Sequence, residues 1–464
     1  MNHWNEQKIY VYLALFFGML FVFLTPPFQS PDEDSHFKRS YQISKGNIYP
    51  VEKNHEIGNY FPKEMLNYID GKLTMQGDRS KKESYLDIVK DEQKGMNYDV
   101  KKFQNYSTVK VIPIVYIAPA IGIIFSKICA RVLGLEMVST TYMLYFARMF
   151  SLIATIIITA FAIKITPIRK KTFLTVALIP MCLFLGSMVS YDNILNASLL
   201  LALAIILNIT YEKKKVDNKD LLILVLIGII LLNLKTIYFL IFILMFAIPA
   251  KKFGTTKDKI KIGAILLGTI IFITIIMKLP YLFLDNSAKD ESPMMIKQMF
   301  FILNHPLKYI SYICYNIKVG RFFQLSSAVG LFGLLDTYNP NFINILIYIN
   351  LIIIGLTEGI REKIKIDKLT KILIIIYAII VVIGVYTALY ITWTSIELHK
   401  IGTKVITGVQ GRYFIPIIMP LLLLLSFNKG KDKKIFKIIE ENYLLVPIIT
   451  LLISICSIFL RFWI

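Results

Sequence analysis

The segment Ile9–Phe28, with the sequence IYVYLALFFGMLFVFLTPPF, decides the class of fold because it is almost entirely apolar. A helix needs about 20 apolar residues to cross the hydrocarbon core of a bilayer. The segment is too long for the apolar part of a cleavable signal peptide. It ends in Thr25-Pro26-Pro27 and contains no small-residue cleavage site. We therefore interpret it as a first membrane span that is retained.

The rest of the chain has the same character. Of its 464 residues, 56% are hydrophobic, and the mean hydropathy of +0.60 lies well above that of soluble domains. These values predict one integral membrane domain over residues 1–464, embedded in a lipid bilayer. The net charge of +21 could suggest a nucleic-acid partner. We expect none, because many basic residues fall in short loops between apolar stretches.

The four cysteines indicate neither a metal centre nor a disulfide framework. Cys129, Cys182, Cys314 and Cys456 are scattered through apolar or nearly apolar stretches, without a C-x-x-C pair or a histidine at ligand spacing. We expect them to be small buried hydrophobic residues. The sequence predicts no metal and no cofactor.

Short basic loops set the expected topology, since cytoplasmic loops are enriched in Lys and Arg. Five segments fit: Lys164–Lys171, Lys213–Lys219, Lys251–Lys261, Arg361–Lys371 and Lys429–Lys437. A cytoplasmic N-terminus followed by eleven spans places all five on the cytoplasmic side. The expected spans are 9–27, 139–163, 172–190, 193–210, 219–234, 236–250, 259–279, 341–357, 370–390, 411–427 and 443–461.

Two further apolar stretches, Ile112–Ile128 and Tyr309–Leu335, would disturb this alternation if either crossed once. We interpret both as juxtamembrane or re-entrant, which is tolerated where protein surrounds the backbone. The prediction is an all-α polytopic membrane protein with about 11 transmembrane helices. Its extracytoplasmic loops are 29–139, which is long and carries juxtamembrane helices, 280–340 and 390–411.

The segment Ser30–Arg39, SPDEDSHFKR, directly follows the first span and has two competing interpretations. Ser30 as N-cap and Glu33 three residues later have the spacing of a capping box, and the carboxylates would complement the helix dipole. The same carboxylates, with His36 one turn after Asp32, also form a dense ionisable group at the membrane edge. One of them could act as a general base on an acceptor hydroxyl. Residue chemistry alone favours the cap.

Other charged residues lie at the expected outer ends of spans. Asp192 is in an outer turn, Lys235 separates two apolar runs, Arg412 opens a span, and Arg148 lies within an apolar run. Ionisable groups at such places are costly and point to function, although Lys235 and Arg412 could simply extend toward the interface. Cations that can bind phosphate and carboxylates that can take a proton face the same compartment. That combination suits sugar transfer from a lipid phosphate.

These residues resemble, in order along almost the whole chain, a bacterial family of multi-span membrane proteins of largely unknown function. That family itself resembles the GT-C class of lipid-dependent glycosyltransferases. The matching pieces are Pro31-Asp32-Glu33 with His36-Phe37 and Arg39; Tyr41-Gln42-Ile43 with Gly46; Pro113 with Tyr116 and Ala120; Ala147-Arg148; Pro180-Met181; Ser190-Tyr191-Asp192; Leu234-Lys235; Gly330 with Gly333 and Asp336; Trp393-Thr394; and Gly408-Val409-Gln410-Gly411-Arg412-Tyr413-Phe414 with Pro416.

The resemblance implies a GT-C-like core in the bacterial cell membrane, with a polyprenyl-phosphate-linked sugar as donor. The acceptor would be a surface glycan or a lipid-linked saccharide. The catalytic carboxylate falls on Asp32 and Glu33, and we prefer Asp32 as the base because the capping box would occupy Glu33. Lys235 and Arg412 would hold the donor phosphate without a metal. The supporting or substrate-binding residues would be His36, Arg39, Tyr191, Asp192, Asp336, Trp393, Gln410 and Tyr413.

Two alternatives from other classes stay open. One is a transporter or flippase of lipid-linked glycans, which would need charged residues along a path through the membrane. The other is a non-catalytic scaffold for the assembly of cell-wall polymers. Reconstituted sugar transfer would separate an inverting glycosyltransferase from both.

Overall fold

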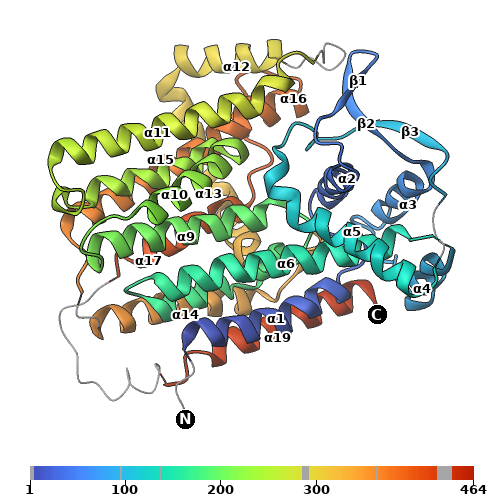
Figure 1. Ribbon diagram of the computed structural model, residues 1–464, viewed down its shortest axis with the longest axis horizontal. Helices are drawn as coiled ribbons and strands as arrows, with labels where there is room; N and C mark the ends of the chain where they lie inside the picture. Colours follow the sequence, from blue (N-terminus) through green and yellow to red (C-terminus); the bar gives the residue numbers. More distant parts are fainter. Residues whose placement is uncertain (1–4, 95–96, 136, 285–291, 362–363, 426–440) are drawn as a thin grey trace.

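The chain folds into a bundle of long helices with a smaller cap of outer-loop elements at one end (Figure 1). The computed structural model describes residues 5–94, 97–135, 137–284, 292–361, 364–425 and 441–464, and 72% of the chain is helical. The bundle is formed by α1 (Glu6–Leu24), α6 (Thr140–Ile165), α7 (Lys170–Ala177), α8 (Pro180–Ser187), α9 (Tyr191–Tyr211), α10 (Asn218–Leu234), η2 (Thr236–Ala247), η3 (Ala250–Lys252), α11 (Thr256–Lys278), η4 (Leu279–Tyr281), α14 (Asn341–Arg361), α15 (Lys368–Leu389), α17 (Ile415–Leu422) and α19 (Leu445–Phe462).

Eight helices in the described part of the chain are long and apolar enough to cross a membrane. The number is nine if α7 and α8, which meet at an angle of 62°, form one broken span. The all-α, polytopic architecture is therefore confirmed. The other expected spans coincide with shorter helices, namely α10, η2 and the segment Gly411–Leu422. A total of eleven crossings stays a prediction.

The two stretches that we did not count as spans differ from each other. Pro113–Val132, made of η1 (Pro113–Tyr116) and α5 (Ile117–Val132), is one of the eight helices that are long and apolar enough. Yet α5 packs against α2 of the first outer loop as well as against α6, where a Cβ on Gly122 would lie 2.5 Å from the carbonyl oxygen of Phe146. The second stretch lies on α13 (Pro306–Val329), which is not among the eight. The juxtamembrane interpretation of α5 remains a prediction.

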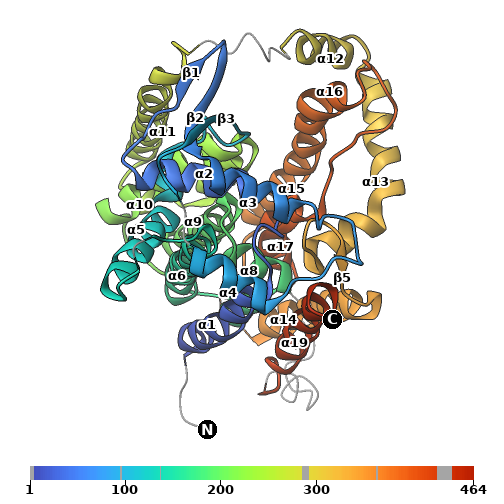
Figure 2. The ribbon, with the colours of Figure 1, turned by 90° about the vertical axis from the view of Figure 1, so that its right-hand side faces the viewer.

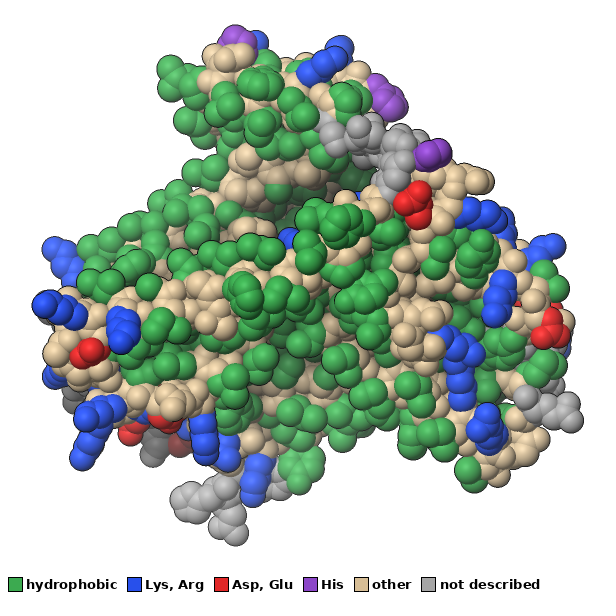
Figure 3. All heavy atoms as spheres, turned by 45° about the horizontal axis from the view of Figure 1, so that its top comes forward, with side chains coloured by type: hydrophobic (Ala, Val, Ile, Leu, Met, Phe, Trp, Pro, Cys, Tyr) green, Lys and Arg blue, Asp and Glu red, His purple; other side chains and the backbone are tan. Residues whose placement is uncertain are grey.

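Basic loops meet at one end of the bundle, and Figure 3 shows Lys and Arg side chains at this end and also at the opposite one. The backbone N–H of Val216 donates to the carbonyl of Lys252 at 3.0 Å. At the same end the Tyr211 hydroxyl donates to Asp367 at 2.7 Å, and the N–H of Lys171 donates to Glu358 at 3.0 Å. Four of the five basic loops therefore lie together. The fifth, Lys429–Lys437, lies outside the described residues.

The first and last helices run in the same direction, so that the two ends of the chain lie at opposite ends of the bundle (Figure 1). The indole N–H of Trp463 donates to the carbonyl of Leu24 at 2.8 Å. The N–H of Glu83, in the first outer loop, donates to the carbonyl of Phe462 at 2.7 Å. Both α1 and α19 thus end beside the first outer loop. If the first and last spans run in the same direction, the chain crosses the membrane an odd number of times, which agrees with the expected eleven crossings.

The first outer loop contains the expected short helices and a small sheet that the sequence did not predict. Its elements before η1 are α2 (Glu33–Ser44), β1 (Val51–Lys53), β2 (Glu56–Pro62), α3 (Lys63–Leu73), α4 (Tyr85–Lys94) and β3 (Lys101–Asn105). The strands form an antiparallel sheet in the order β1-β2-β3. Asn54 and His55 join β1 to β2 with positive φ angles of 52° and 59°, as in a tight hairpin turn.

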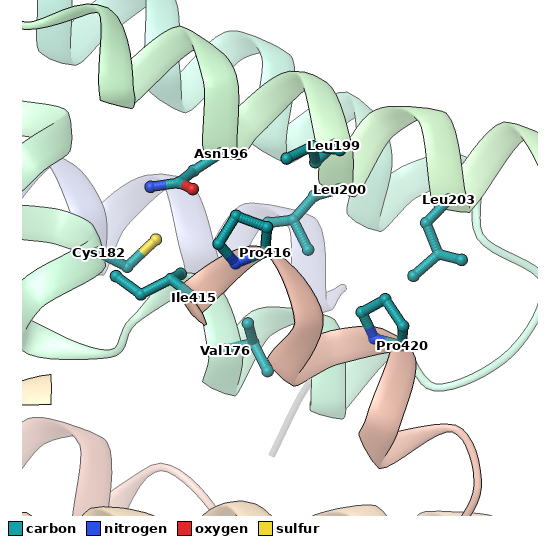
Figure 4. Close-up of a pocket in the computed structure, with 9 residues that line it drawn as sticks. All are labelled: Val176, Cys182, Asn196, Leu199, Leu200, Leu203, Ile415, Pro416 and Pro420. Atoms are coloured by element: carbon teal, nitrogen blue, oxygen red, sulfur yellow. The ribbon is translucent and has the colours of Figure 1, made fainter. Parts of the chain in front are cut away.

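The other two outer loops fold against each other on one side of the bundle (Figure 2). They comprise α12 (Ser292–Asn304), α13, β4 (Leu331–Phe332), β5 (Thr337–Tyr338), the π-helical turn η6 (Tyr390–Thr394), α16 (Ser395–Glu397) and η7 (Gly411–Phe414). The Asn316 amide donates to the carbonyl of Lys404 at 2.8 Å, which fastens α13 to the third loop. Inside the bundle, Pro416 and Pro420 of α17, the helix that follows η7, face the leucines of α9 (Figure 4).

Candidate functional site

Asp32 and Glu33, the two predicted catalytic carboxylates, point into different environments. Helix α2 begins at Glu33, and Asp32 precedes it with φ of 59°, in the left-handed region. No side chain caps the helix, and the Ser30 hydroxyl has no hydrogen-bond partner among the described residues. The predicted capping box is therefore wrong. The S-x-x-E spacing fits a cap, but the left-handed residue turns the Glu33 carboxylate into the bundle instead.

Glu33 forms a closed ion pair with Arg148 of α6. The two N–O distances are 2.8 and 2.6 Å, and both side chains are 0% exposed. The Glu33 carboxylate also accepts the backbone N–H of Val189 at 3.1 Å. Arg148 donates in addition to three carbonyls at the end of α1, those of Val22, Thr25 and Pro26. This pair joins α1, α2, α6 and the start of α9. We correct the catalytic assignment of Glu33 to a structural one, because a substrate cannot reach it.

Asp32 belongs to a second, more open group of charges, which we call the outer charge cluster: Asp32, Asp192, Lys235 and Arg412. The Arg412 guanidinium lies 3.2 Å from the Asp32 carboxylate and 3.6 Å from that of Asp192. The Lys235 ammonium lies 2.9 Å from Asp192. Arg412 and Asp192 are only 5% and 9% exposed, whereas Asp32 is 61% exposed. Residues far apart in sequence thus form one site, with one carboxylate open to a ligand.

Local backbone features explain why these charges meet. Asp192 lies in the first turn of α9, where its N–H donates to the Ser190 hydroxyl at 3.1 Å. Lys235 has an extended backbone conformation and separates α10 from η2. Gly411 precedes Arg412, and a Cβ there would lie 1.8 Å from the Gln324 carbonyl oxygen of α13. Glycine is therefore required for η7 to approach α13 closely enough to hold Arg412 at the cluster.

Aromatic rings surround the cations. The Lys235 ammonium lies 4.6 Å from the ring centre of Tyr413 and 5.2 Å from that of Tyr191, distances at which a cation is attracted to the ring face. The Tyr191 ring meets the His36 imidazole edge to face at 4.7 Å. His36 Nδ1 lies 2.7 Å from the hydroxyl of Tyr116. This frame holds the side chain of Lys235 in place.

Burial lowers the pKa of the His36 imidazole to about 4, although the carboxylates of Asp32 and Asp192 oppose the shift. His36 is therefore neutral at physiological pH. It adds no positive charge to the outer charge cluster and is not a proton donor at that pH. It contacts Tyr116 and Tyr191, and its supporting or substrate-binding role stays a prediction.

A cavity of about 330 Å³ opens beside the cluster. Its walls combine the first outer loop, the β4–β5 turn, the end of α15, the third loop and η7. The lining residues are Pro31, Asp32, Gln76, Leu334, Leu335, Leu389, Trp393, Gly408, Gln410, Arg412 and Tyr413. The volume lies at the lower end of the range for small-molecule sites. Five of the predicted site residues line it, while Gln76 was missed because nothing distinguishes it within a polar loop.

Two predicted site residues have other tasks. The Arg39 guanidinium donates to the Val111 carbonyl at 2.8 and 3.0 Å and to the Tyr281 hydroxyl at 3.0 Å, which ties α2 to neighbouring segments. Asp336 pairs with Arg461 at the end of α19 at 2.7 Å. Neither side chain lines the cavity. Both support the loops around the site, and we do not place either in contact with a substrate.

Within the described residues no group of three or more His, Cys, Asp or Glu side chains is arranged to hold a metal ion. The carboxylates of the outer charge cluster are each within 4 Å of a cation. Lys235 and Arg412 supply positive charge at this site. Arg and Lys are suited to phosphate and carboxylate ligands.

The long apolar helices and the charged cavity at one end of the bundle define a multi-pass membrane protein with a polar site near the end of its helices. The family model described as "Predicted membrane protein (DUF2142)" matches residues 15–421, and the chain belongs to this family. No curated protein and no solved structure matches the chain significantly.

Proposed function

We propose that the protein is an inverting glycosyltransferase. It transfers a sugar from a polyprenyl-phosphate donor to a hydroxyl group of a surface glycan or lipid-linked acceptor, on the extracytoplasmic face. The observation that carries the proposal is the contact between an exposed carboxylate, Asp32, and a buried cation, Arg412, at the mouth of a cavity. A general base and a phosphate ligand are the two groups that this reaction needs from the protein.

The charges of the cluster suggest how donor binding prepares the base. Two cations and two carboxylates balance each other, and His36 is neutral. Of the ion pairs in the cluster, the contact between Asp32 and Arg412 is the most accessible to water, because the Asp32 side chain is 61% exposed. Water screens such a contact more than it screens a fully buried pair. A donor phosphate can therefore displace Asp32 from Arg412. The displaced carboxylate is then free to accept a proton, and the phosphate meets a group with a net positive charge.

In the chemical step, the acceptor hydroxyl gives its proton to Asp32, and its oxygen forms a bond with the anomeric carbon. The bond between that carbon and the phosphate oxygen breaks on the opposite face, which inverts the configuration. The polyprenyl phosphate leaves with the electron pair, and Lys235 and Arg412 stabilise the charge that develops on it. Such positioned cations supply the electrostatic stabilisation that lowers a barrier of this kind.

An apolar groove supports a lipid as the carrier of the sugar. It encloses about 320 Å³ between α13, α14, α15 and α17, and it begins at Phe414, two residues after Arg412. Its lining is mainly aliphatic and aromatic, with Arg321 and Gln324 among the few polar residues. A prenyl chain in this groove would leave its phosphate beside the outer charge cluster.

Sugar transfer in proteoliposomes tests the proposal. Purified protein is mixed with a panel of radiolabelled polyprenyl-phosphate sugars and a cell-envelope extract as acceptor. We expect label to move from the lipid fraction to an acceptor, with inverted anomeric configuration. Movement of intact lipid-linked sugar between leaflets without transfer would instead favour a flippase. If the protein neither transfers nor moves any donor of the panel, the proposal fails and a scaffold role gains support.

A further inference from the structure

The uncharged wall of the cavity has features that the transfer of a phosphate-linked group does not itself require. Trp393 lies in the π-helical turn η6, and its side chain is 53% exposed where it lines the cavity. Single π-helical turns inside α-helices are frequent at functional sites. A large aromatic ring kept in contact with a polar cavity is suited to a ligand that has both an apolar and a polar surface.

The position of the Trp393 ring is enforced by its neighbours. A Cβ on Gly408 would lie 2.8 Å from the indole Cδ1 and 3.1 Å from Nε1, and Gly408 has a positive φ of 76°. Only glycine accommodates both the backbone conformation and the close ring. The loop that carries Gly408 is fastened to the π turn, because the N–H of Thr407 donates to the Thr394 hydroxyl at 3.0 Å. The neighbouring backbone therefore holds the indole in a fixed position beside the cavity.

Two amide side chains lie around the same cavity. Gln76 comes from the first outer loop and Gln410 from the third. The side-chain oxygen Oε1 of Gln410 is buried and has no hydrogen-bond partner among the described residues. A glutamine side chain can both donate and accept hydrogen bonds, which matches the hydroxyl groups on the edge of a sugar. Asp32 and Arg412 line the same cavity.

We propose that Trp393, with Gln76 and Gln410, forms a carbohydrate-binding wall. The apolar face of a pyranose ring stacks on the indole, and the two amides bind hydroxyl groups at the ring edge. This inference rests on the proposed function for the identity of the ligand. It adds the residues that select the sugar, whether that sugar belongs to the donor or to the acceptor. The competing role for an exposed Trp is that of an anchor at the membrane interface.

Fluorescence of Trp393 distinguishes these roles. The chain contains three tryptophans, so that replacing Trp4 and Trp463 by Phe leaves Trp393 as the sole emitter. The full-length protein in nanodiscs is titrated with geranyl phosphate, with geranyl-phosphate esters of glucose, galactose, mannose and N-acetylglucosamine, and with free oligosaccharides from the cell envelope. We expect at least one sugar-bearing probe to change the emission, while geranyl phosphate alone does not.

Variants make the test specific. Trp393→Ala should weaken binding of the responding sugar about 10-fold, with unchanged binding of geranyl phosphate. Trp393→Phe should restore most of that loss, because a ring remains. Gly408→Ala should displace the indole and shift the emission in the absence of ligand, with the same loss of sugar binding.

The outcomes separate this inference from the proposed function. A response to free oligosaccharides alone assigns the wall to the acceptor, and a response to the phosphate esters alone assigns it to the donor. If the esters bind by calorimetry but neither alter the emission nor depend on Trp393, the carbohydrate wall is refuted while the transferase proposal stands. Binding of free sugars without any donor binding would support the wall and count against the transferase. A lack of response to every carbohydrate would also refute the wall.

Discussion

Asp32 and Glu33 are adjacent in sequence, but their carboxylates have opposite environments. Glu33 is sealed against Arg148 with 0% exposure, and every contact that it makes fixes helices to one another. Asp32 is 61% exposed and makes its ion pair at the mouth of a cavity. The difference arises from one left-handed residue at the start of α2. Burial and partners, rather than residue type or position in a motif, decide which of two carboxylates can react.

The broadest test of this comparison is the side of the membrane on which both carboxylates lie. Ser80, exposed in the first outer loop, is replaced by Cys on a background in which the four native cysteines are changed. We expect an impermeant maleimide to label intact cells fully, because the predicted topology places this loop outside the cytoplasm. Labelling that requires permeabilised cells would place Asp32 in the cytoplasm and exclude a reaction at the outer face.

The next largest effect should come from breaking the closed pair. Glu33→Gln leaves the Arg148 guanidinium buried without its counter-charge, which typically costs about 3–5 kcal/mol of stability. We expect a strongly lowered unfolding temperature in detergent, measured by size-exclusion chromatography after heating. Asp32→Asn is the matched control, since it makes the same chemical change one residue earlier. Equal unfolding temperatures for the two variants would contradict the assignment of Glu33 as structural.

The cations of the outer charge cluster should affect the ligand more than the fold. Lys235→Ala or Arg412→Ala removes a charge-assisted contact with the donor phosphate, which is worth about 2–5 kcal/mol of binding free energy when buried. Donor affinity is measured by calorimetry with geranyl-phosphate sugars. Lys213→Ala is the control, because Lys213 is also ion-paired but lies among the basic loops. Unchanged donor affinity in both cluster variants would show that Lys235 and Arg412 do not bind the donor phosphate and have a purely structural role.

A smaller effect should follow from His36. Its pKa is about 4 in the folded protein and about 6.5 in an unfolded chain. Above pH 6.5 the imidazole is neutral in both states and has no effect on the pH dependence of stability. As pH falls toward 4, only the unfolded state binds the proton, and stability is lost, by about 2 kcal/mol at pH 5.

His36→Gln removes this titration while keeping a hydrogen-bonding side chain beside Tyr116. Unfolding temperatures at pH 8 and pH 5 should therefore diverge more in the wild type than in the variant. The same pH dependence in both proteins would show that His36 titrates normally. In that case it would be a candidate proton carrier at the outer charge cluster rather than a neutral support.

The sequence predicted the helical membrane architecture because apolar stretches of sufficient length have few alternatives in a bilayer. Charged residues at the expected outer ends of spans are costly unless used, which singled out Asp192, Lys235 and Arg412, and the family resemblance added Asp32. The structure brings all four together. Their role as a site stays a prediction.

The partner of Glu33 could not be predicted in the same way. Arg148 lies 115 residues further along the chain, and the local S-x-x-E pattern offered a plausible cap instead. The β1–β2 hairpin was missed because β1 is short and mostly charged, and because β2 lacks a clear alternation of apolar side chains. Gln76 lines the cavity only because of the way in which the first outer loop folds. Such features depend on contacts between distant segments, which a single sequence does not display.

The most direct test of Asp32 as the general base is single-turnover sugar transfer by Asp32→Asn in proteoliposomes, with donor binding measured in parallel. Asn tolerates the left-handed backbone conformation of this position, so folding should be preserved. Without the competing carboxylate at Arg412, the donor should bind at least as tightly as in the wild type. We predict that transfer falls by about 10²–10⁴-fold while donor binding is retained. Transfer at a near-normal rate by the correctly folded variant would contradict the role of Asp32 as the base.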